Sequence, residues 1–100
     1  MRIANGYVLA EITVEDVRKM TDGSILIVMR VLRNQQGKFV RREYYRAELQ
    51  RKKTAAGYEE VLSSAPNDEW ETTPVWDNGW IWLGSEKNRV DGYFIIDGKA

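Results

Sequence analysis

The chain of 100 residues carries 15 basic and 15 acidic side chains, and it contains neither cysteine nor histidine. Without these two residue types it has no disulfides, no thiolate or imidazole metal ligands, and no Ser-His-Asp or Cys-His catalytic groups. The length suits a single domain over residues 1–100, and the sequence shows neither a signal peptide nor the ~20 apolar residues of a membrane span. We therefore expect a soluble, cytoplasmic protein that uses no cofactor and is not an enzyme.

The first quarter of the chain predicts a strand followed by a short helix. Residues 7–12 are mostly apolar and suit a half-buried strand. Thr13 and Asp16 have the spacing of a capping box, and Gly23 suits the position just after the last helical turn. Apolar residues also recur at helical spacing in this stretch. We expect a helix over residues 13–22, in preference to a continued strand.

The centre of the chain predicts a hairpin with a buried first strand. Five consecutive aliphatic side chains within residues 24–33 indicate burial on both faces of a sheet. Residues 34–37 end in glycine and favour a turn, after which the chain returns as an antiparallel second strand. This second strand is expected to run to about Leu49, and residues 51–53 then form a basic tail.

The last part of the chain contains one ambiguous stretch and one clear strand. Residues 50–69 allow two interpretations, a hairpin turn with a strand at residues 58–63 or a short helix. Residues 90–97 predict a final strand. Its Gly92 is a candidate for a bulge or for close approach of another chain segment.

Asn78 and Gly79 lie between two apolar runs, which is the strongest short-range signal for a two-residue hairpin turn. In that register Trp80 and Trp82 share one face of the sheet, while Trp76 lies on the other. Because these tryptophans cannot all enter one core, at least one should be partly exposed.

Five or six short strands and one helix near residues 13–22 define the expected fold class. It is α+β and mainly β, a small curved antiparallel sheet or barrel. If the sheet is open, its edge offers a route to a homodimer.

The charges are segregated along the chain although they cancel overall. Residues 30–53 hold nine basic and two acidic side chains, a net charge of +7, and residues 54–100 hold a net charge of −6. Such asymmetry is an indication about partners. Its ordinary structural explanation is that the acidic segment folds back beside the basic one and neutralises it.

Strand alternation places Arg42, Tyr44 and Arg46 on one face, and Phe39 with Arg41 on the other. Guanidinium groups at this spacing can meet successive phosphates while a ring stacks on a base, as in sequence-tolerant single-strand binders. The first functional hypothesis is therefore a non-catalytic module that binds a polyanion, either single-stranded nucleic acid or a nucleotide-like ligand. The candidate ligand-binding residues are Arg41, Arg42, Tyr44, Arg46, Arg51, Lys52 and Lys53.

The alternative hypothesis is a small protein-binding inhibitor or adaptor of the kind that phages and mobile elements encode. Exposed tryptophan is a typical anchor in protein interfaces. The candidate partner-binding residues are Trp70, Trp76, Asp68, Glu69 and Glu71. Their three carboxylates are interpreted as a solvated loop rather than a magnesium site, so no metal is expected.

Overall fold

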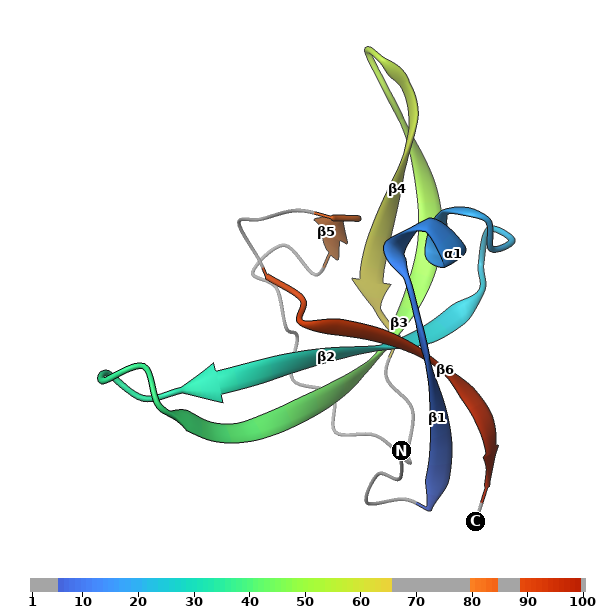
Figure 1. Cartoon of the computed structure of the whole chain (residues 1–100). Coiled ribbons are helices and arrows are strands. Elements are labelled where there is room, and N and C mark those ends of the chain that lie inside the picture. Colours follow the sequence, from blue (N-terminus) through green and yellow to red (C-terminus); the bar gives the residue numbers. More distant parts are fainter. Residues whose placement is uncertain (1–5, 66–79, 85–88, 100) are drawn as a thin grey trace.

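A computed structural model of the chain describes residues 6–65, 80–84 and 89–99. These residues form a six-stranded antiparallel sheet with the strand order β1-β6-β2-β3-β4-β5, together with one short helix (Figure 1). The sheet is curled and stays open between its edge strands β1 and β5. The predicted class, a small mainly β fold with one helix, is confirmed, and the open sheet rather than the barrel is what the described strands form.

The elements follow the chain as β1 Tyr7–Ile12, α1 Val14–Arg18, β2 Ile25–Arg33, β3 Phe39–Thr54, β4 Gly57–Ser64, β5 Trp80–Trp82 and β6 Gly92–Lys99. The first strand has the predicted bounds, and β2 begins one residue after its predicted start. Among the described residues, no helix is long and apolar enough to cross a membrane.

The helix α1 begins as predicted but ends early. The Thr13 hydroxyl accepts the N–H of Asp16 at 3.1 Å, and the Asp16 carboxylate accepts the N–H of Thr13 at 2.9 Å, which completes a capping box. The C-cap is Lys19, so the prediction that Gly23 follows the last turn is wrong. Gly23 instead has a φ of 88° and donates its N–H to the carbonyl of Leu49 at 2.7 Å, which joins the segment after α1 to β3.

Strand β2 is buried on both faces, as its aliphatic run predicts. Leu26 and Val28 belong to a core cluster that includes Val17 of α1, so the helix covers this face of the sheet. Ile27 and Met29 point to the other face and pack with a second cluster that contains Phe94. Alternating side chains of one strand therefore contribute to two cores.

Strand β3 spans 16 residues and belongs to two hairpins. Its first part pairs with β2 and its second part pairs with β4, and Figure 1 shows these hairpins projecting in different directions from the centre of the sheet. The predicted end of this strand near Leu49 is wrong, because pairing continues to Thr54 opposite Gly57. The open choice over residues 50–69 is settled in favour of a strand, which runs over residues 57–64.

The far end of the β2–β3 hairpin extends beyond its neighbours in the described sheet. Strand β6 begins at Gly92 opposite Met29 of β2. A Cβ on Gly92 would lie 3.0 Å from Cε2 of Phe94 and 3.1 Å from Cε of Met29, so the predicted close approach is confirmed. The Asp91 carboxylate then accepts the N–H of Val31 at 2.7 Å and ends the ladder. From this point to the turn, β2 and β3 pair with each other as a two-stranded ribbon.

Strand β5 places Trp80 and Trp82 on one face, as predicted. Their rings meet edge to face with centroids 5.1 Å apart. Ile81 and Leu83 point the other way into the core cluster under α1. The predicted turn at residues 78–79 and the tryptophan at position 76 lie outside the described residues.

Candidate nucleic-acid interface

We call residues 30–46 the basic hairpin; they comprise the second half of β2, the turn and the first half of β3. A β-bulge interrupts its register, because Leu32 pairs with Arg41 whereas Arg33 pairs with Phe39, which leaves Val40 as an extra residue on β3. The bulge moves Phe39 to the opposite face from the one that simple alternation predicts. Phe39 therefore shares a face with Arg42, not with Arg41.

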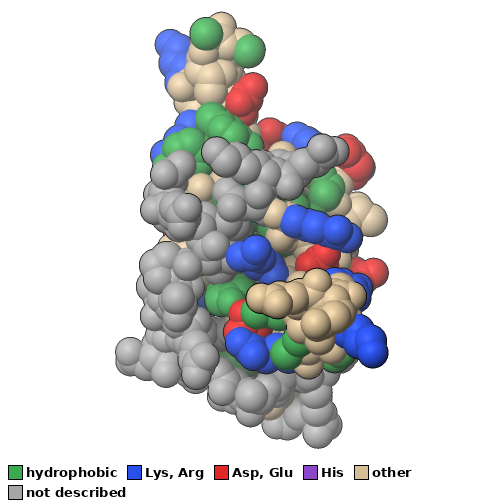
Figure 2. Space-filling model, turned by 90° about the vertical axis from the view of Figure 1, so that its left-hand side faces the viewer, with side chains coloured by type: hydrophobic (Ala, Val, Ile, Leu, Met, Phe, Trp, Pro, Cys, Tyr) green, Lys and Arg blue, Asp and Glu red, His purple; other side chains and the backbone are tan. Residues whose placement is uncertain are grey.

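Phe39 and Arg42 form the most accessible aromatic and cationic pair on the basic hairpin. Phe39 is 51% exposed, and the guanidinium carbon of Arg42 lies 5.0 Å from the centre of its ring. Neither Lys38 nor Arg42 forms an ion pair within the described ranges. Figure 2 shows Lys and Arg side chains gathered around the turn of this hairpin, which points toward the viewer.

Tyr44 lies between Arg42 and Arg46 on one face, as the alternation predicts, but it packs against the protein. Its ring meets Phe94 edge to face with centroids 6.0 Å apart and joins the second core cluster. Arg46 donates from Nη1 to the carbonyl of Ala65 at 2.6 Å. The predicted stacking platform is thus half-buried, and the exposed ring beside a guanidinium is that of Phe39.

Arg41 lies on the opposite face and compensates the acidic residue of the β3 half of the hairpin. Its Nε and Nη2 each lie 3.3 Å from Oε2 of Glu43, while the Tyr45 hydroxyl donates to Oε1 at 2.6 Å. The hydrogen bond from Tyr45, with Arg41 in support, lowers the pKa of Glu43. The Glu43 carboxylate therefore stays ionised and pairs with Arg41. It does not pair with Lys38 or Arg42 near the turn.

The other three candidate cations lie in the β3–β4 hairpin, away from the basic hairpin. Arg51 is opposite Glu60, and Lys52 is opposite Glu59. Arg51 donates from Nη2 to two carbonyls beside the end of α1, those of Arg18 and Met20. Two carboxylates of the acidic segment, Glu59 and Glu60, therefore lie beside this second half of β3.

Lys52 and Lys53 point to opposite faces of β3. The ammonium nitrogen of Lys52 lies 4.2 Å from the centre of the Trp80 ring. Lys53 is exposed and pairs in register with Tyr58. Neither residue extends the cluster around Phe39.

Sequence reasoning missed Phe39, Lys38 and Arg33 as site residues. The net positive charge of residues 30–53 could have indicated Lys38 and Arg33 as site residues. No local sequence pattern indicates the bulge at Val40, which brings Phe39 to the face of Arg42. The predicted partner-binding residues all lie at positions 68–76, outside the described ranges, so their role stays a prediction. Across residues 6–65, 80–84 and 89–99 no three Asp or Glu side chains group as metal ligands would.

Comparison with known proteins adds no family to these observations. No protein-family model, no curated protein and no solved structure matches the chain. The functional argument therefore depends on the geometry alone.

Proposed function

We propose that the chain is a non-catalytic module that binds a polyanion, most simply single-stranded nucleic acid, through the basic hairpin. The observation that carries the proposal is the exposed Phe39 ring stacked with Arg42 at the end of a projecting two-stranded ribbon. A base can stack on this ring while the guanidinium group meets the adjacent phosphate. Lys38 and Arg33 add positive charge beside the same turn.

The arrangement favours contact with the backbone and stacking over the reading of base sequence. Arg33 uses Nη1 to donate to the carbonyl of Gly37 at 3.1 Å, which stabilises the turn and keeps its charge there. About three to four phosphate contacts by these cations would make log K fall by about two to three for each tenfold rise in salt. A steep salt dependence with weak sequence preference is the expected signature.

Fluorescence polarisation with a labelled oligothymidylate at about 50 mM salt tests the proposal. Phe39→Ala should weaken binding about tenfold, as loss of one stacked base implies. Arg42→Glu should weaken it at least as much, because a phosphate contact becomes a repulsion. Lys53→Glu is the matched control, since it makes the same charge change at an exposed site on the β3–β4 hairpin and should have a small effect.

Two results would overturn the proposal. One is the absence of any binding at low salt. The other is an equal loss of affinity in Arg42→Glu and Lys53→Glu, which would mean that only net charge matters. A labelled duplex measured in parallel shows whether base stacking contributes to binding, because paired bases cannot stack on the Phe39 ring. We expect Phe39→Ala to leave the affinity for the duplex unchanged.

A further inference from the structure

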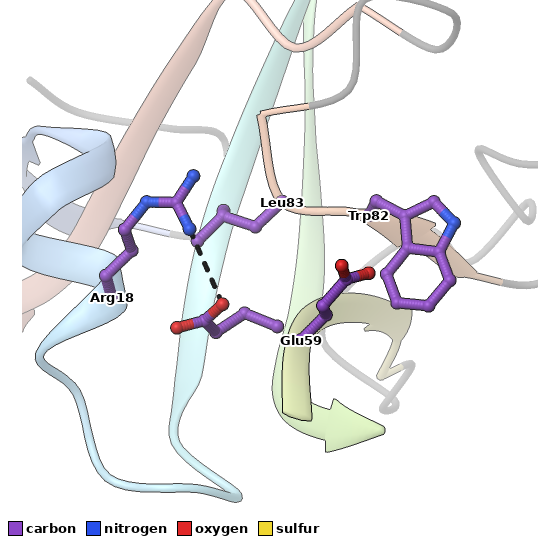
Figure 3. Close-up of a pocket in the computed structure, with 5 residues that line it drawn as sticks. Arg18, Glu59, Trp82 and Leu83 are labelled. Carbon is purple, nitrogen blue, oxygen red and sulfur yellow. Dashed lines mark hydrogen bonds and ion pairs between the residues drawn. The ribbon is translucent and has the colours of Figure 1, made fainter. Parts of the chain in front are cut away.

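A small hollow lies where β5 leaves β4, away from the basic hairpin. Its volume is about 250 Å³, and it is lined by Arg18, Glu59, Glu60, Trp82 and Leu83 (Figure 3). The N–H of Leu83 donates to the carbonyl of Glu60 at 2.9 Å, and Gly84 then turns the chain with a φ of 78°. The hollow is therefore built by Trp82 of β5 and the following Leu83 against β4, with Arg18 of α1 beside them.

The charges around the hollow favour a cation. Arg18 is already engaged, since its Nη1 lies 3.4 Å from Oε2 of Glu60 and its Nε lies 3.7 Å from Oε1 of Glu15. Glu59 has no ion pair with any residue in the described part of the chain, and Figure 3 shows its carboxylate turned toward Trp82. Within the described residues, a carboxylate without an ion pair thus lies beside an accessible indole ring, and the nearest cation on this face, Lys52 opposite Glu59, lies over Trp80 instead.

The chain itself shows how this pair of tryptophans takes a cation. The ammonium group of Lys52 lies over the ring of Trp80, which meets Trp82 edge to face on the same side of the sheet. Trp82 is 36% exposed, and no cation lies over its ring in the described structure. An indole face next to a carboxylate is a strong combination for a cationic side chain, above all a planar guanidinium group.

The size and position of the hollow indicate what kind of molecule carries this cation. Pockets for drug-sized ligands measure roughly 300–1,000 Å³, so a hollow below that range suits a single side chain. No strand of the described chain pairs with the outer edge of β4 from Glu59 back to Gly57. An extended peptide can therefore place its backbone along this edge while one side chain enters the hollow.

We propose that this hollow binds an arginine side chain from an extended segment of a partner protein. The guanidinium group lies over Trp82 and donates to the carboxylate of Glu59, which shares this face of the sheet with Trp82. This site is independent of the basic hairpin and does not depend on nucleic-acid binding. It places a protein-docking surface on the acidic part of the chain.

An NMR titration tests the proposal with N-acetyl-arginine-methylamide and a short extended peptide that contains one arginine. The indole N–H signal of Trp82, assigned with Trp82→Phe, should shift in a saturable way at millimolar probe concentrations. The corresponding citrulline compounds have the same shape without the charge and should cause no saturable shift. Glu59→Gln should weaken binding about tenfold, as loss of a charge-assisted hydrogen bond implies. Glu11→Gln, an exposed carboxylate on β1, is the matched control and should change nothing.

Three results would overturn the inference. The arginine probes could fail to shift the signal up to about 50 mM, a concentration far above that of a useful site. The citrulline and arginine probes could shift it equally. Finally, the Trp82 signal could shift with rising protein concentration in the absence of any probe, and this shift could be lost in Glu59→Gln. The hollow would then bind a second copy of this chain.

Discussion

Replacing Arg51 by methionine tests whether this cation of β3 stabilises the end of the helix α1 instead of binding a ligand. The substitution keeps the apolar stem but removes the Nη2 group, which donates to the carbonyls of Arg18 and Met20 at 3.0 Å each. Each half-exposed bond contributes about 1 kcal/mol, and a cation beside the end of a helix adds a few tenths. We expect the free energy of unfolding to fall by about 2 kcal/mol, which lowers Tm by about 8–16 °C.

Thermal unfolding followed by circular dichroism measures this effect, with Arg42→Met as the matched control. Arg42 contacts the exposed Phe39 ring, so the same loss of charge there should change the stability by less than about 0.5 kcal/mol. A Tm for Arg51→Met within about 2 °C of the parent protein would refute the reasoning. Equal destabilisation by both substitutions would do the same.

Three further predictions concern stability in urea titrations. Thr13→Ala removes the hydroxyl that accepts the N–H of Asp16 at 3.1 Å, so we expect a loss of about 1 kcal/mol, and an unchanged midpoint would contradict a role for this cap. Gly92→Ala brings a methyl group within 3.0 Å of Cε2 of Phe94, so we expect a loss of about 1–3 kcal/mol, and full stability would mean that the ring moves aside freely. Burial, together with a hydrogen bond to a carboxylate, raises the pKa of Tyr45 to about 12, above its ordinary value near 10. Because the folded state keeps this proton longer, stability should fall as the pH rises from about 10 to about 12, and Tyr45→Phe should reduce that slope; equal slopes would count against the assignment.

Features that depend on local sequence were predictable. The capping box needs only Thr13 and Asp16, and both of its hydrogen bonds form. The aliphatic run of β2 implies burial on two faces whatever its neighbours are, and both cores use it. The shared face of Trp80 and Trp82 follows from strand alternation alone.

Features that depend on distant pairing were not predictable. The helix ends at Arg18, and the segment that leads from it to β2 pairs with Leu49 of β3, while Arg51 of β3 donates to the carbonyls of Arg18 and Met20. The second half of β3 persists because β4 pairs with it, which the sequence of β3 does not reveal. The bulge at Val40 changes the face of Phe39, and with it the composition of the candidate site, without any composition signal of its own.

The pairing of β2 with β6 has a consequence for the order in which the protein folds. Both hairpins of β3 close between nearby residues and can form early, whereas β2 must wait for β6. Until residues 92–99 leave the ribosome, the edge of β2 around Ile27 lacks its neighbour, although this side chain is fully buried in the finished sheet. A nascent chain with such an edge is prone to aggregate. The time taken to synthesise β6 and the segment before it therefore sets how long this edge of β2 stays unpaired.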